Sequence, residues 1–236
     1  MEEKLSELVR RLKSALGDHL VSAILYGSAA MGDWHEQSSD LNVLCVLDRV
    51  SRTELAESEP VFHWWRQQGN PPPLLMSEEE IRTASDSFPM EFHDMQEHRR
   101  VLYGADVIQN LNVDRSFYRA QVEHELRAKQ IRLRQKAAEL LSRPEQLMNL
   151  LTGSVSTFCV LGRHALILSG NEPHWKKKEI IAALERAIGT PFEGANAILA
   201  VRAAGKRRTE VDTTLVFDKY LAETDLLVRF VDGLDR

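Results

Sequence analysis

The spacing of apolar residues changes near Asn110, and this change constrains the fold more than any other feature of the sequence. Before it, short apolar runs such as Leu20–Tyr26 and Leu41–Leu47 alternate with helical patterns, and after it only helical patterns follow. Short apolar runs closed by glycine or polar residues are typical of buried strands, whereas apolar residues three and four apart indicate helices. The pattern predicts an α/β (α+β) domain over residues 1–110 and an all-α helical bundle over residues 111–236.

The remaining elements follow from the same periodicities and from start and stop signals. In the first half we expect helices over 5–16 and 52–68, a brief helix after the capping box of Ser77 and Glu80, and strands over 74–76 and 88–95. In the second half we expect helices over 114–141, 144–170, 177–188 and 191–203, and a last helix to residue 231 that begins at the cap Asp212.

A glycine and a serine close the first predicted strand, and an aspartate opens the second. Gly27 allows a sharp turn and a close approach of the backbone to a ligand. Ser28 then starts a short predicted helix, whose free N–H groups and hydroxyl favour a phosphate. Because strand side chains alternate, Asp40 and Asn42 point to one face and Leu41 to the other. Two oxygen-bearing side chains beside a phosphate site predict Mg²⁺ bound together with a nucleotide.

Gly27-Ser28, a short spacer and then Asp40-Leu41-Asn42 in an apolar strand form a pattern that resembles the DNA polymerase β-like nucleotidyltransferase superfamily. The resemblance covers residues 20–104 and implies a small mixed sheet flanked by helices. It also implies transfer of a nucleoside monophosphate from a Mg²⁺-bound triphosphate to a hydroxyl of a small molecule or protein. AMP is our first choice for the transferred group. An α/β half followed by a helical bundle is similar to the minimal and aminoglycoside-modifying branches.

The resemblance further implies a third carboxylate on a later strand, and the segment Phe88–Met95 supplies two candidates. Glu91 lies between Met90 and Phe92, where an unpaired charge is costly to bury in a strand. A role as metal ligand or general base accounts for it, and a glutamate on a solvated sheet face or in an ion pair is the alternative. Asp94 falls on the opposite face of a regular strand and is our second choice.

The resemblance thus assigns Asp40 and Glu91 to catalysis, with Mg²⁺ held by these two residues and Asn42. The triphosphate, ATP in our first choice, is assigned to Gly27, Ser28, Asp40 and Asn42. Asn42 departs from the family pattern, which has a second Asp or Glu at this place. An amide offers a neutral oxygen, cannot act as a base and removes one negative charge. The alternative hypothesis is therefore a degenerate nucleotidyltransferase that binds a nucleotide or a partner protein without turnover.

The overall charge argues against a protein that grips long nucleic acid. The net charge is −5, and such proteins usually show a basic face. This disfavours a third hypothesis, a polymerase or terminal transferase acting on RNA. Two clusters, Arg99–Arg100 and Lys206–Arg208, are candidates for contact with a triphosphate, but a charge run is more often a solvated face.

The N-terminus has no charged-then-apolar signal segment, and no apolar run approaches the roughly 18 residues of a membrane span. The two cysteines, Cys45 and Cys159, lie in apolar runs and are expected to be buried thiols in a reducing compartment. We therefore expect a cytoplasmic protein without a membrane partner, and the sequence is compatible with an oligomer.

Overall fold

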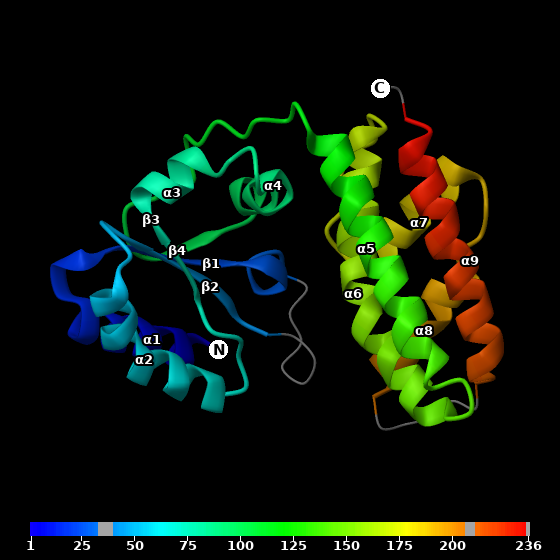
Figure 1. Ribbon diagram of the computed structural model, residues 1–236, viewed down its shortest axis with the longest axis horizontal. Helices are drawn as coiled ribbons and strands as arrows, with labels where there is room; N and C mark the ends of the chain where they lie inside the picture. Colours follow the sequence, from blue (N-terminus) through cyan, green and yellow to red (C-terminus); the bar gives the residue numbers. More distant parts are fainter. Residues whose placement is uncertain (33–39, 206–210, 235–236) are drawn as a thin grey trace. The chain divides into compact units, whose positions relative to one another are not determined.

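The computed structural model describes residues 1–32, 40–205 and 211–234 and divides the chain into two compact units. The division falls between Ser116 and Phe117, a few residues after Asn110. Figure 1 shows a sheet with helices on both faces in the first unit and helices without strands in the described part of the second. This confirms the predicted fold class, a mixed sheet with flanking helices followed by an all-α region.

The first unit has a four-stranded sheet in the order β3-β2-β1-β4. Strand β1 is antiparallel to both β2 and β4, while β2 and β3 are parallel, so the sheet is mixed. The elements in chain order are α1 (Glu2–Leu16), η1 (Gly17–His19), β1 (Leu20–Tyr26), η2 (Gly27–Ala29), β2 (Asn42–Leu47), α2 (Arg52–Gln67), β3 (Leu74–Ser77), α3 (Glu78–Thr83), α4 (Pro89–Glu97) and β4 (Arg100–Gly104).

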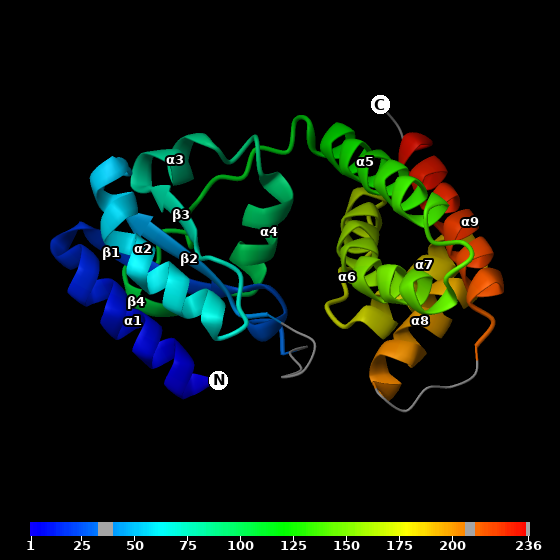
Figure 2. The same cartoon turned by 60° about the horizontal axis from the view of Figure 1, so that its bottom comes forward.

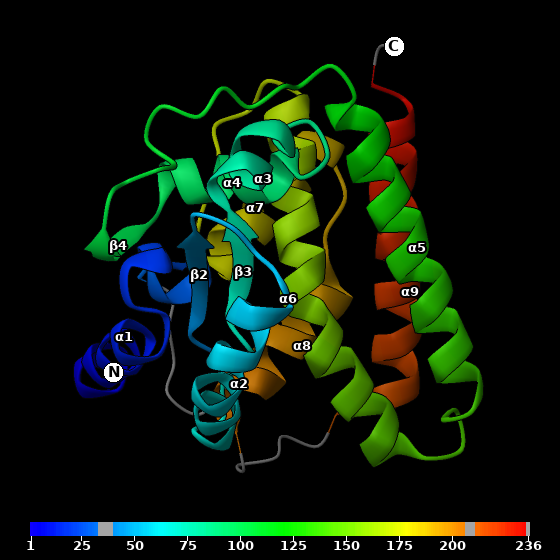
Figure 3. The same ribbon diagram turned by 60° about the vertical axis from the view of Figure 1, so that its left-hand side comes forward.

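Helices cover the two faces of this sheet in pairs (Figure 2). Leucines at helical spacing along α1 pack with Val61 and Trp65 of α2 on one face, where Val43 and Cys45 of β2 meet them. On the other face, α3 and α4 pack against the alternate residues of β1 and β2. Figure 3 shows α3 and α4 on that side of β2 and β3. Both central strands are therefore buried on both faces, which explains their nearly continuous apolar runs.

The segment after α3 is a helix, so the strand predicted over Phe88–Met95 is wrong. Helix α4 begins at Pro89, whose fixed φ suits the first helical position, where its missing N–H is not needed. Phe92 and Met95 are three residues apart and both buried against the sheet. Glu91 directly precedes Phe92 in sequence but is exposed, because the helix turns it away from that face.

The second unit contains helices that closely follow the predicted ones. They are α5 (Tyr118–Ala138), α6 (Pro144–Leu168), α7 (Lys177–Ile188), α8 (Glu193–Ala204) and α9 (Thr213–Asp232). Asp212 caps α9 as predicted, since its carboxylate accepts hydrogen bonds from the backbone N–H groups of Thr214 and Leu215 at 3.0 and 3.1 Å.

Helix α6 is long and apolar enough to cross a membrane by length and composition, contrary to the expectation that no segment is. It is the only such helix in the described part of the chain, and 56% of its most apolar window is buried within the structure. Its residues contact α5, α7, α8 and α9, which is how the central helix of a bundle packs. Cys45 and Cys159 are buried and form no disulfide with each other, as predicted, and burial raises the pKa of Cys45 to about 12.

Candidate functional site

The turn after β1 is in direct contact with the start of β2. Tyr26, the last residue of β1, pairs with Asn42, the first residue of β2. Gly27 follows with φ of +74°, a backbone conformation that residues with a Cβ rarely adopt. A Cβ on Gly27 would lie 2.9 Å from Nδ2 of Asn42, which is closer than real Cβ contacts come. Glycine is needed here for its backbone angle and for the close approach of the Asn42 amide.

Ser28 lies in a single turn of 3-10 helix, not at the start of a longer helix. The backbone N–H groups of Ala30 and Met31 both donate to the carbonyl of Gly27, at 3.0 and 3.1 Å. Ser28 itself is half-buried. So short a segment has no macrodipole of consequence, so any affinity for phosphate at Ser28 depends on its hydroxyl and on nearby N–H groups.

Asp40 stands just before β2 and is exposed. The next residue, Leu41, is buried, and its backbone N–H donates to Oδ1 of Asn70 at 3.1 Å. Asn70 is only 8% exposed, and its Nδ2 has no hydrogen-bond partner among the residues that the structure describes. This bond ties the start of β2 to the loop after α2, so Asn70 helps to fix where the backbone of Asp40 lies.

The first residues of β2 alternate between the two faces of the sheet, as predicted. Leu41 and Val43 are buried in the core beneath α1 and α2, whereas Leu44 is buried in the core on the α4 side. Asn42 therefore faces the α4 side, where it is half-buried. Asp40 precedes the first paired residue of β2, so strand pairing does not set the direction of its side chain.

Glu91 lies in the first turn of α4, and Tyr26 packs against the core that this helix covers. Burial raises the pKa of Tyr26, and the negative charge of Glu91 raises it further. Because Tyr26 pairs with Asn42, we expect Glu91 to lie on the side of the sheet that Asn42 faces.

Asp94 is now a neighbour of Glu91 on one helix face, since the two are three residues apart on α4. The reason for ranking it second, an opposite face of a strand, no longer applies. The Asp94 side chain is 14% exposed, and its Oδ1 lies 3.7 Å from Nδ1 of His93. The choice between Glu91 and Asp94 as third acid remains a prediction.

The two later strands carry no carboxylate: β3 reads Leu-Leu-Met-Ser and β4 reads Arg-Val-Leu-Tyr-Gly. Among the described residues, the predicted donors are the Asp40 carboxylate, the Asn42 amide oxygen and one carboxylate of α4, with Glu91 as our first choice. Mg²⁺ takes one or two carboxylates and completes its shell with phosphate oxygens and water. This donor set fits such an ion, with less negative charge than two acids on β2 would supply.

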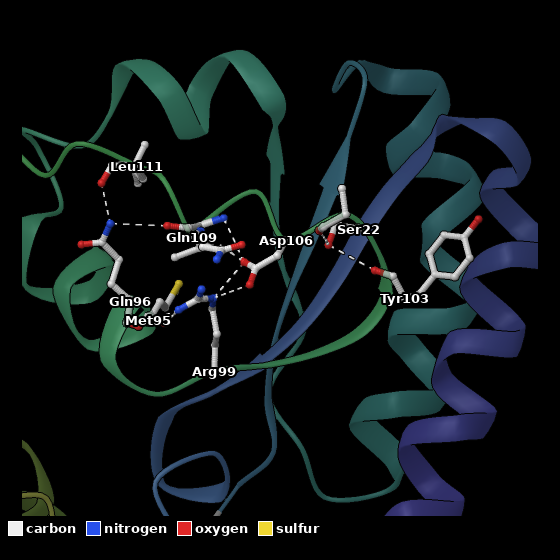
Figure 4. Close-up of polar contacts among 10 residues, drawn as sticks. Ser22, Met95, Gln96, Arg99, Tyr103, Asp106, Gln109 and Leu111 are labelled. Atoms are coloured by element: carbon white, nitrogen blue, oxygen red, sulfur yellow. Dashed lines mark hydrogen bonds and ion pairs between the residues drawn. The ribbon is translucent and has the colours of Figure 1, made fainter.

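Arg99 and Arg100 have structural partners, which argues against the role in triphosphate binding considered above. Figure 4 shows the Arg99 side chain directed toward Asp106 and toward the C-terminal end of α4. Its Nε donates to the Asp106 carboxylate at 2.8 and 3.0 Å, and its Nη1 donates to the carbonyls of Met95 and Gln96. Arg100 pairs with Glu2 at 2.9 Å. The cluster Lys206–Arg208 lies outside the described residues.

Asn70 and Tyr26 were not identified from the sequence as parts of this site. Asn70 stands between a glycine and three prolines, which were interpreted only as the end of a helix. An amide in so constrained a loop is a signal for a backbone hydrogen bond, but its partner at Leu41 is set by tertiary structure. Tyr26 ends an apolar strand, and nothing in the sequence distinguishes it from a core residue.

One of three comparisons with known proteins bears on the fold. No protein-family model matches the sequence, and no curated protein matches it significantly. Among solved structures, the chain is similar to the spectinomycin adenyltransferase AAD(9) from Enterococcus faecialis, a structure with ATP and spectinomycin. The identity is 14% and the TM-score 0.62, over 99% of this chain and 100% of that chain. The chain therefore has an α/β nucleotidyltransferase fold followed by a helical domain.

Proposed function

We propose that the chain is a Mg²⁺-dependent nucleotidyltransferase that transfers AMP from ATP to a hydroxyl of a small molecule or protein. The observation that carries this proposal is the contact between the Gly27 turn and Asn42 at one end of β1 and β2, on the side of the sheet that α4 covers. The similarity to an adenyltransferase structure over nearly the whole chain supports it. Since that structure holds ATP and spectinomycin, ATP and a hydroxylated aminocyclitol are the first ligands to test.

Each residue has a definite part in this proposal. The Gly27 backbone and the Ser28 hydroxyl contact the triphosphate, and Asp40 with the Asn42 amide oxygen would hold Mg²⁺. When bound, the ion neutralises charge on the phosphates. Glu91 accepts the proton of the attacking hydroxyl, whose oxygen forms a bond to the α-phosphorus. The bond from the α-phosphorus to the bridging oxygen breaks, and pyrophosphate leaves.

A second candidate function is nucleotide binding without turnover. Two observations favour it: an amide at position 42 where the family has an acid, and the lack of a carboxylate on β3 and β4. Loss of an outer-shell group at a metal site commonly costs about 10–100-fold in affinity or activity. Loss of a charged ligand should cost at least as much.

ATP binding and pyrophosphate release, measured separately with Mg²⁺ and candidate acceptors, distinguish the two functions. We expect Asp40→Ala to weaken Mg²⁺-dependent ATP binding and to lower release by more than about tenfold. Asp18→Ala is the matched control, because Asp18 is an exposed aspartate before the opposite end of β1. Normal binding and release by Asp40→Ala would show that the site is misplaced.

The variant Asn42→Asp decides between turnover and binding alone. If the natural chain binds ATP but releases no pyrophosphate, and Asn42→Asp gains release, the second function holds. If the natural chain releases pyrophosphate, and this release depends on an acceptor and on Glu91, the first function is supported. Absence of ATP binding with intact folding would contradict both.

A further inference from the structure

A cavity lies within the second unit, between α5, α6 and α9. Its volume is about 460 Å³, inside the range of roughly 300–1,000 Å³ that is typical of small-molecule sites. The walls are largely apolar, with Leu126 and Leu133 from α5, Phe158 and Leu161 from α6, and the ring of Tyr220 from α9. All of these side chains are buried, so the cavity has rigid hydrophobic walls.

Gly153 keeps the cavity open on the α6 side. It lies in the interior of a helix, where glycine costs about 1 kcal/mol relative to alanine. A Cβ placed on it would meet no atom within 4 Å. Gly153 is exposed and lines the cavity, so the open space beside it lies at the mouth of the cavity, where a large side chain can cover the opening without colliding with the fold.

The rim of the cavity is basic. Lys129, Arg132 and Lys136 line it from α5, at spacings of three and four that place them on one helix face. Lys129 has a partner, Glu125, at 3.4 Å, but among the described residues no ion pair reaches Arg132 or Lys136. None of the lining residues in the described part of the chain is acidic. The rim therefore keeps two cationic groups, those of Arg132 and Lys136, without an ion-pair partner among the described residues.

Polar groups in the walls are held by hydrogen bonds within the protein. Ser154 donates to the hydroxyl oxygen of Tyr220 at 3.1 Å, and Gln130 donates to Asp225 at 2.5 Å. Asp225, which accepts this hydrogen bond from Gln130, is also paired with Arg134 at 2.7 Å. These bonds hold the wall side chains in place, so the cavity is preformed. The negative charge of Asp225 is already balanced by Arg134.

We propose that this cavity binds a small amphipathic organic acid. The apolar body of the ligand fills the space between α5, α6 and α9, and its anionic group lies at Arg132 and Lys136. A polycationic ligand would be repelled by the same rim. The inference rests on the second unit alone and does not depend on the proposed nucleotide site.

Titration of the full chain with the fluorescent anion anilinonaphthalene sulfonate tests the proposal. Its uncharged analogue, phenylnaphthylamine, has the same aromatic body without the sulfonate. We expect saturable binding of the anion, weakened at least about tenfold by Gly153→Phe, a loss of about 1.4 kcal/mol or more. Gly153→Ala, which adds only a methyl group, should retain binding.

The charge requirement is tested by the double variant Arg132→Gln/Lys136→Gln. This variant should weaken binding of the anion by several fold and leave binding of the uncharged analogue unchanged within about twofold. Lys178→Gln/Arg186→Gln removes the same charge from exposed positions on α7 and serves as the matched control. Circular dichroism confirms that each variant is folded. Anion binding that survives Gly153→Phe, or that falls equally in both double variants, would overturn the proposal.

Discussion

Replacing Gly27 with alanine tests whether the turn after β1 and the Asn42 amide form one structural unit. Two costs are visible at this position. The first is the left-handed backbone, φ of +74°, which costs a residue with a Cβ about 1–2 kcal/mol. The second is the new Cβ, which would lie 2.9 Å from Nδ2 of Asn42 and would force that side chain to move.

The second cost can be sized from rotamer energies. A side chain pushed about 30° from its rotamer loses about 0.5–1.5 kcal/mol. Gly27→Ala is therefore expected to lower the free energy of unfolding by about 1.5–3.5 kcal/mol. Gly189 supplies the matched control, because its φ is +75° and a Cβ there would meet no atom within 4 Å. Gly189→Ala should lower the free energy of unfolding by the backbone cost alone, about 1–2 kcal/mol.

Urea unfolding monitored by circular dichroism measures the loss of unfolding free energy in both variants. The double variant Gly27→Ala/Asn42→Ala removes the crowded amide, so its loss should be smaller than the sum of the two single losses by about 0.5–1.5 kcal/mol. ATP titration of the same proteins should show weaker binding for Gly27→Ala and unchanged binding for Gly189→Ala. Equal losses at the two glycines, together with strict additivity in the double variant, would refute the reasoning.

Three further predictions concern stability. Asn70→Ala leaves the buried N–H of Leu41 without its acceptor and should cost about 1–3 kcal/mol in urea unfolding, whereas Asn70→Asp, which keeps an acceptor oxygen, should keep that hydrogen bond. Burial raises the pKa of Glu223 from 4.5 to about 7, so the folded state binds this proton more tightly and stability should fall by up to about 3 kcal/mol as pH rises from about 4.5 to about 7. Glu223→Gln should abolish that part of the pH dependence, and an unchanged profile would contradict the assignment. Gly194→Ala places a Cβ 2.5 Å from the backbone nitrogen of Tyr220 and should lower the melting temperature by separating α8 from α9, more than Gly153→Ala does.

The sequence predicted those elements whose periodicity continues long enough to be unambiguous. The helices of the second unit repeat their apolar positions over three or more turns, and β1 and β2 are uniformly apolar because both faces are covered. The strand predicted over Phe88–Met95 is wrong because eight residues can satisfy the period of 2 of a strand and the period of 3.6 of a helix at once. Pro89 followed by Glu91 was the available signal for a helix start, and it outweighs so short an alternation.

The site was predicted less completely than the fold, because its geometry depends on contacts between distant segments. Gly27 and Asn42 were identified from their residue types, but the contact between the Gly27 backbone and the Asn42 amide follows from strand register. The hydrogen bond from Leu41 to Asn70 joins residues 29 positions apart, and no local pattern announces it. Glu91 lies on a helix that covers one face of the sheet, although the argument that selected it assumed a strand.

The amide at position 42 makes nucleotide binding and turnover depend on different properties of the same site. A neutral side chain beside the Gly27 turn removes a like charge that would repel a triphosphate. The same change takes one negative ligand from Mg²⁺, which prefers carboxylate and phosphate oxygens. We therefore expect nucleotide binding to lose less from Asn42 than the step that needs the ion and a base. In the proposed site that charge comes from Asp40 before β2 and from an acid of α4, Glu91 in our first choice, so we expect their distance with nucleotide bound to decide whether this geometry turns over.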